Sequence, residues 1–220
     1  MRASLLLHMA AAAPVLLTAC AAPSGSVTQF DLGPQYADAS FDPRLANTRT
    51  VTEVSAPAWL DNPAIVYRLA YADASRAQAY AQSQWVAPPA SLLSQRLRER
   101  LFLVLPSGVA QVGGIQPASA CLLQVELDEF SQVFDTPQTS HALLRARATL
   151  TDSNRNELVA QRVFEVEQPA PSPDASGGAH GLRDAVDQFI TELLQWMDQQ
   201  QPGRVVLVGD KRSARDLARP

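Results

Sequence analysis

The chain has 220 residues, with 18 Lys or Arg against 22 Asp or Glu, so its formal charge at neutral pH is −4. This slightly acidic balance argues against general affinity for nucleic acid, which depends on basic patches. The length is sufficient for one large domain or two small ones once a leader has been removed.

Residues 1–19 have the pattern of a lipoprotein signal peptide. A basic start at Arg2 precedes a mainly apolar run over 3–17, which suits a secretory leader. A membrane-spanning helix needs about 20 apolar residues, so this run is too short to be one. The order Leu-Thr-Ala-Cys that ends at Cys20 is that of a bacterial lipobox. We therefore expect cleavage before Cys20 and attachment of lipid to its thiol; the alternative is an ordinary signal peptide whose cysteine is incidental.

If Cys20 carries lipid, residues 20–27 form a lipidated tether. Within it the small and polar stretch Ala21–Ser26 reaches about 20 Å at roughly 3.4 Å per residue, which holds the domain close to its membrane. The second cysteine, Cys121, lies in an apolar, strand-like stretch, where we expect it to be a buried small hydrophobe. No partner then remains for an intramolecular disulfide, so packing must supply the stability.

The first half of the domain is expected to contain strands followed by a helix. Stretches that are β-branched or alternate between apolar and polar residues predict three strands, over 27–33, 48–57 and 64–71. For 71–85 a hairpin and a short helix both remain open. A helix is predicted from Pro88, with leucines at three-to-four spacing up to Leu105 and with Arg96 among the charged residues on its other face.

The second half is expected to begin with a three-stranded meander. Alternation and turn residues predict strands over 121–135, 140–152 and 157–167. In the middle strand, Arg145 and Arg147 should face solvent, opposite Glu165 and Glu167 on its neighbour.

The C-terminal part begins with 168–178, which is rich in Pro, Ser and Gly and is predicted to be a linker. The clearest helix follows, with an apolar stripe from Leu182 to Met197. Two further segments are candidate short strands, 109–112 in a loop and 204–208 in the tail, and the chain from Lys211 onward is expected to be disordered. We therefore expect one α/β domain over 28–202 and a tail over 203–220.

The sequence offers little to catalysis, and we expect a protein that is not an enzyme and holds no cofactor or metal. It has no G-x-S-x-G turn, no phosphate-binding loop and no His or Cys spacing typical of a metal site. His180 with Asp184 would make a hydrolase dyad, but an exposed helix start is the favoured interpretation. Strand alternation places Glu129 on the side opposite Glu126 and Asp128, which indicates a solvated face.

Aromatic and charged residues near the middle of the domain are candidates for contact with a partner. They belong to two stretches, one around a turn and one just before the first helix, and comprise Trp59, Asp61, Tyr67, Arg68 and Trp85. Ordinary packing in a core or at a strand edge is the competing interpretation for each of them.

The order of these features resembles the ABC-type transport auxiliary lipoproteins, the group that includes paraquat-inducible protein C. A lipobox cysteine, a strand near "FDLG", the stretch "WLDNPAIVYR" and a tryptophan before "LLSQRLRERL" follow one another. The residues that match the family pattern in order are Pro57, Leu60, Asp61, Pro63, Ile65, Val66, Tyr67, Arg68 and Trp85. The chain departs from the family at Phe30-Asp31-Leu32, where a doubled tyrosine is more usual, and in the tail after Gly203.

The resemblance implies a single three-layer α/β domain, with a mixed sheet and helices on both faces, similar to the N-terminal domain of TolB. It implies a non-enzymatic lipoprotein that works with an MCE-domain protein and an ABC transporter in moving lipids or other hydrophobic molecules between membranes. Ala21 after the lipid cysteine implies the periplasmic face of the outer membrane, and some relatives assemble as rings. A structural or regulatory envelope lipoprotein, such as an activator of a cell-wall synthase, is the alternative.

Overall fold

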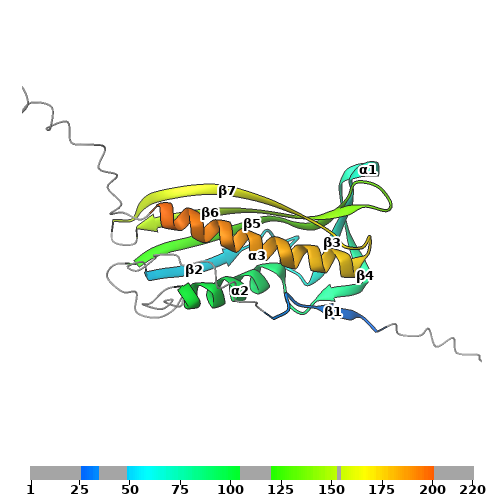
Figure 1. Cartoon of the computed structure of the whole chain (residues 1–220), viewed down its shortest axis with the longest axis horizontal. Helices are drawn as coiled ribbons and strands as arrows, with labels where there is room; N and C mark the ends of the chain where they lie inside the picture. The colour runs from blue at the N-terminus through cyan, green and yellow to red at the C-terminus, as the bar shows by residue number, and fades with distance from the viewer. Residues whose placement is uncertain (1–25, 35–48, 105–119, 153–154, 201–220) are drawn as a thin grey trace, which may run out of the picture.

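The computed structural model describes residues 26–34, 49–104, 120–152 and 155–200. They form seven strands and three helices (Figure 1). In chain order these are β1 (Thr28–Phe30), β2 (Arg49–Ser55), β3 (Ala64–Leu69), α1 (Ala70–Asp73), β4 (Ala74–Trp85), α2 (Pro89–Val104), β5 (Ala120–Phe134), β6 (Ser140–Asp152), β7 (Glu157–Pro169) and α3 (Ala175–Gln199).

All seven strands belong to one mixed sheet, in the order β1-β4-β3-β5-β6-β7. β2 and β3 both run parallel to β5 and share one of its edges, β2 along its first half and β3 along its last residues. β5, β6 and β7 form the two predicted antiparallel hairpins. The predicted α/β class with a mixed sheet is therefore confirmed.

The meander has one apolar and one charged face because its residues alternate. Every second residue of β6 from Ala142 to Leu150 is buried, and Arg145 between them is exposed. On the outer face Arg145 pairs with Glu165 at 2.6 Å, as expected, whereas Arg147 pairs with Glu126 at 2.9 Å. Burial of one face of each strand fixes the register, since a one-residue slip would turn every side chain over.

A β-bulge at Asp128 changes the predicted orientation of the carboxylates in β5. Leu127 lies opposite Ala146 and Glu129 opposite Arg145, so Asp128 is the extra residue. Glu129 consequently lies on the outer face with Arg145, and Phe130 takes the next place in the core. The expectation that Glu129 lies opposite Asp128 is wrong for this reason.

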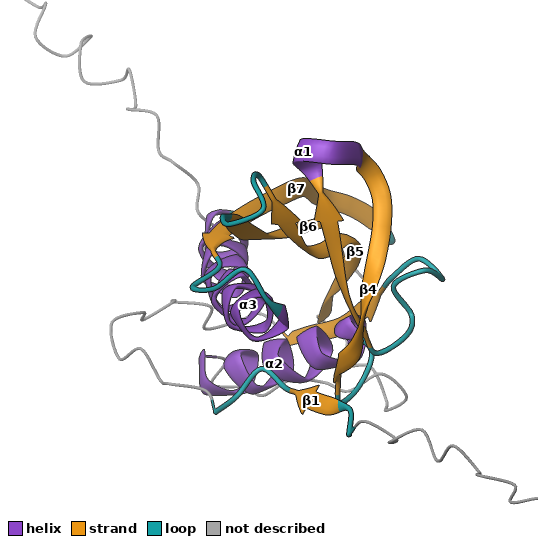
Figure 2. Cartoon of the chain, turned by 90° about the vertical axis from the view of Figure 1, so that its right-hand side faces the viewer, coloured by secondary structure: helices purple, strands orange, loops and turns teal. Residues whose placement is uncertain are grey.

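Both long helices lie on the concave side of the curved sheet, as Figure 2 shows. α3 packs along β6 and β7, and α2 packs against β2. Their leucines, including Leu97, Leu101 and Leu193, are buried in one continuous core with Phe130 and Phe164 of the sheet. We expected helices on both faces of the sheet. Instead both long helices lie on one face, and the outer face of β5–β7 carries exposed ion pairs.

Two predicted segments take a more regular form than expected. Residues 71–85 are mostly the long strand β4, which follows the single turn α1. The predicted linker 168–178 contains the end of β7 and the start of α3, whose N-cap is Asp174. Its glycines allow close packing rather than flexibility: a Cβ on Gly177 would lie 2.0 Å from the carbonyl oxygen of Ser172.

Several expectations fall on residues outside the described ranges. They are the signal peptide 1–19, Cys20, most of the tether, the candidate strands 109–112 and 204–208, and the tail 203–220. Cys121 lies in β5, as expected.

Candidate partner-binding site

The stretch "WLDNPAIVYR" begins with a compact turn that fixes which of its side chains point outward. The backbone N–H of Leu60 donates to the carbonyl of Pro57 at 2.8 Å. Asn62 closes the turn, because its side chain donates to the Trp59 carbonyl and accepts from the Ala64 N–H. Leu60 is buried in the core, so the turn leaves Trp59 and Asp61 exposed.

Arg68 of β3 lies behind Trp59 and is held from several directions. Its guanidinium donates two hydrogen bonds to the Glu129 carboxylate, at 3.2 and 2.9 Å, and further ones to the carbonyls of Ala74 and Ser75. Its Cζ lies 5.6 Å from the centroid of the Trp59 ring, a distance at which cation and ring attract. The bidentate pair orients Arg68 so that it supports the Trp59 ring, which is 40% exposed.

Tyr67, on the other side of β3, packs inward. Its ring lies 4.6 Å from that of Tyr80 and its hydroxyl donates to Gln78. The Tyr80 hydroxyl donates to Gln132, a fully buried side chain of β5. Burial raises the pKa of Tyr80 to about 12, with smaller contributions from the nearby Tyr67 and Asp174. Tyr67 therefore belongs to a half-buried aromatic cluster that joins β3, β4 and β5.

Trp85 is a core residue, and its candidacy as a partner contact is corrected. The side chain is 0% exposed and its ring lies 5.6 Å from that of Phe130. Its backbone N–H donates to the Pro63 carbonyl, which ties the end of β4 to the turn. A tryptophan enclosed in this way presents no surface to a partner. Its indole Nε1 has no hydrogen-bond partner in the structure.

Asp61 lies at the rim of a shallow cavity of about 460 Å³ between the 54–61 segment and the first turns of α2. The opposite wall consists of Ser91, Ser94 and Arg98, and Arg98 donates to the hydroxyl of Ser94 at 2.6 Å. Asp61 thus stands beside a polar cavity, two residues along the chain from the exposed Trp59. Aromatic side chains and arginines are enriched at protein-binding surfaces.

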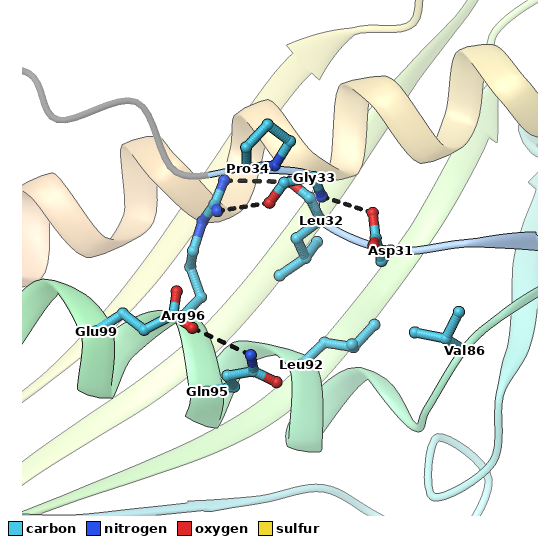
Figure 3. Close-up of a pocket in the computed structure, with 9 residues that line it drawn as sticks. All are labelled: Asp31, Leu32, Gly33, Pro34, Val86, Leu92, Gln95, Arg96 and Glu99. Carbon is cyan, nitrogen blue, oxygen red and sulfur yellow. Dashed lines mark hydrogen bonds between the residues drawn. The ribbon is translucent and has the colours of Figure 1, made fainter.

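A second cavity, of about 370 Å³, lies between the "FDLG" segment and α2 (Figure 3). Arg96 crosses from α2 and donates to the carbonyls of Leu32 and Gly33. It also makes two hydrogen bonds to Asp187 of α3. The guanidinium therefore holds three segments together through four hydrogen bonds, and Arg96 is 4% exposed rather than on the solvated face predicted from sequence.

Catalytic or metal-binding chemistry finds little support in the described ranges. They contain no group of three His, Cys, Asp or Glu side chains placed to hold a metal ion. Asp184 pairs with its neighbour Arg183 at 2.7 Å, and His180 is exposed at the start of α3. None of the helices in these ranges is long and apolar enough to cross a membrane.

Trp59, Asp61 and Arg68 were predicted from the sequence, and the structure brings them to one surface. Glu129 and the residues on α2 were not predicted. Glu129 lies 61 positions from Arg68 in the chain, and in the sequence it is one of three neighbouring carboxylates, with nothing to single it out. The residues on α2 carried no distinguishing pattern, because serines and arginines are ordinary on the outer face of a helix.

Known proteins share both the sequence pattern and the fold. The family model for the ABC-type transport auxiliary lipoprotein component matches residues 30–193. A crystal structure of a Xanthomonas campestris protein of the DUF330 family is similar, with a TM-score of 0.61 and 22% identity, over 80% of this chain and 94% of that one. Another, of an uncharacterized protein, has a TM-score of 0.60 and 16% identity, over 78% of this chain and 99% of that one. No curated protein matches the sequence.

Because the family model covers well over half of the chain, including the turn, the Arg68 strand, α2 and most of α3, the protein belongs to the family of ABC-type transport auxiliary lipoproteins.

Proposed function

We propose that the protein is a non-enzymatic accessory lipoprotein of an MCE/ABC-type system that transports lipids or other hydrophobic molecules between membranes. In this proposal Cys20 anchors it to the periplasmic face of the outer membrane, and the folded domain docks the MCE-domain protein. Family membership is the observation that carries the proposal, and the lipobox supports the anchor.

The proposed anchor needs more than one acyl chain. Each buried methylene contributes about 0.8 kcal/mol, and a single myristoyl chain gives only marginal, reversible binding. A cysteine with a diacylglycerol on its thiol and a third acyl chain on its amine meets this requirement. Ala21, rather than an acidic residue, follows it, which supports placement in the outer membrane.

The tether leads directly to a fixed point on the domain. β1 pairs in parallel with the last three residues of β4, and the Val86 N–H donates to the Phe30 carbonyl at 2.8 Å. Arg96 then holds the next two carbonyls, and the Leu32 side chain is buried in the core. A force applied at Cys20 would therefore be transmitted to the domain by the β1–β4 hydrogen bonds up to Phe30 and by the Arg96 hydrogen bonds after it.

The surface of Trp59 and Asp61 is our candidate for the docking contact. Trp59 is a large aromatic side chain that is exposed yet held in place by Arg68. Fixing an aromatic ring before binding reduces the entropy lost in the complex, and such rings often supply a large share of binding energy.

Replacement of each cysteine in turn tests the anchor. Cys20→Ala should leave the protein soluble or with its leader uncleaved and should abolish complementation of a deletion strain. Cys121→Ala is the matched control, because it removes a thiol but keeps the lipobox, and it should behave as wild type. Normal membrane fractionation and full complementation by Cys20→Ala would contradict the proposal.

A further inference from the structure

Two of the outer backbone edges of the sheet belong to β7 and β4. β7 pairs with β6 along one side. On the other flank of the sheet, β1 covers only residues Ser83–Trp85 of β4. Within the described part of the chain, the outer edge of 75–82 therefore has no strand partner, and Figure 2 shows β4 bowing outward on that side of the sheet.

The two edges differ in how far their side chains protect them. β7 carries the exposed charges Arg162, Glu165 and Glu167 and ends at Pro169. Charges and prolines on an outer strand are what natural proteins use to prevent pairing with another chain. The stretch 75–82 has no proline and only one charge, Arg76, and three of its exposed residues are alanines.

The chemistry of this edge selects one kind of ligand. A row of backbone N–H and C=O groups pairs with another extended backbone, which adds as a further strand. The exposed methyl groups of Ala77 and Ala79 leave room for the side chains of an added strand. Arg76 favours a carboxylate opposite it, because opposite charges across a strand pair stabilise the pairing.

A second copy of this chain would not bind stably through this edge alone. Stable interfaces use about 20–30 residues on each side, whereas 75–82 offers eight. A segment of a larger partner that is already held nearby by another contact does not have this limitation, because linkage raises its effective concentration.

We propose that the outer edge of β4 over 75–82 binds an extended segment of the MCE-domain partner, with an acidic residue opposite Arg76. This inference rests on the proposed function. The contact would be separate from the surface of Trp59 and Asp61, so that the partner engages the domain at two places.

Hydrogen exchange on the lipidated protein in detergent, with and without the purified periplasmic part of the cognate MCE-domain protein, tests the pairing. Exchange of the outward-pointing amides in 75–82, every second one, should slow by about tenfold or more on binding, because these N–H groups enter a ladder. Exchange in β7 should not change, which provides an internal reference.

A lysine on each outer strand supplies the matched variants. Ala79→Lys places a charge on the β4 edge and should weaken binding by about tenfold. Leu158→Lys places the same charge on β7, at a side chain that is already exposed, and should bind as wild type. Equal melting temperatures for the two variants would show that both are folded.

The outcomes separate the two proposals. Binding by wild type without protection of 75–82, and with Ala79→Lys as tight as wild type, would overturn strand addition but leave docking intact. Absence of any binding by wild type would overturn both. Protection of 75–82 that arises on concentrating the chain alone, together with sedimentation as a dimer, would overturn the choice of partner.

Discussion

Replacing Gly177 with alanine tests the finding that the predicted linker is a packed helix start. The new Cβ would lie 2.0 Å from the Ser172 carbonyl oxygen and 2.6 Å from its backbone nitrogen. These are backbone atoms that cannot rotate away, so the helix or the 172–174 segment must shift. The same shift pulls the Gly177 N–H from Asp174, which accepts it at 2.8 Å.

The size of the effect follows from these contacts. Loss of an N-cap costs about 1 kcal/mol and overpacking of this kind about 1–3 kcal/mol. The helix propensity gained by changing Gly to Ala returns about 1 kcal/mol at most. We expect Gly177→Ala to lower the free energy of unfolding by about 1–3 kcal/mol, a fall in melting temperature of about 2–12 °C for a domain of this size.

Urea denaturation of the unlipidated chain, followed by circular dichroism, measures this loss. Ser176→Ala is the matched control, because it changes the neighbouring residue of the same turn, and it should stay within about 0.5 kcal/mol of wild type. If Gly177→Ala is as stable as wild type or more stable, then helix propensity decides at this position. The close packing described here would then be refuted.

Other expectations concern separate parts of the molecule. Glu129→Gln should lower stability by about 1–3 kcal/mol in urea denaturation, because it leaves the half-buried Arg68 without its carboxylate; a neutral effect would show that the pair does not organise this surface. Trp59→Ala should weaken capture of the MCE-domain protein with little loss of stability, whereas Trp85→Ala should lower stability by about 3–5 kcal/mol; the reverse pattern would contradict their assignment. The pKa of Tyr80 is raised from 10.0 to about 12, chiefly by burial, so the folded state favours the neutral phenol. Its contribution is complete below pH 10 and is lost as pH rises toward 12; alkaline denaturation should therefore shift to higher pH in Tyr80→Phe, and an unchanged midpoint would refute this. Arg96→Ala should make residues 26–34 sensitive to limited proteolysis, since β1 would lose the guanidinium that holds it.

Alternation in the sequence was sufficient to predict the meander and the face that each strand buries. The apolar residues from Ala142 to Leu150 repeat with period two over nine positions, which no helix reproduces. The bulge at Asp128 shifts the alternation of β5, since the core residue after Leu127 is Phe130, but this shift was not recognised from the sequence. Its consequence, a carboxylate beside Arg68, also depends on the pairing of β5 with β3.

The misinterpreted segments have physical causes that lie elsewhere in the chain. Gly177 and Gly178 look like linker residues until Ser172 and Gln132 are placed against them. Arg96 looks like a surface charge because its partners, Asp187 and two carbonyls of the first segment, are distant in sequence. Of the candidate site, the exposed Trp59 and Asp61 were predicted as possible contacts, and only the tertiary structure separated them from the buried Trp85.

Co-isolation from membranes tests the central claim most directly. The lipidated protein is captured from the envelope of its own cells in mild detergent, and the associated proteins are identified by mass spectrometry. We expect the MCE-domain protein of an ABC transport system to be recovered with wild type from the outer-membrane fraction, and far less of it with Trp59→Ala. Capture of the lipidated wild type with no MCE-domain protein, or with a cell-wall synthase in its place, would contradict it.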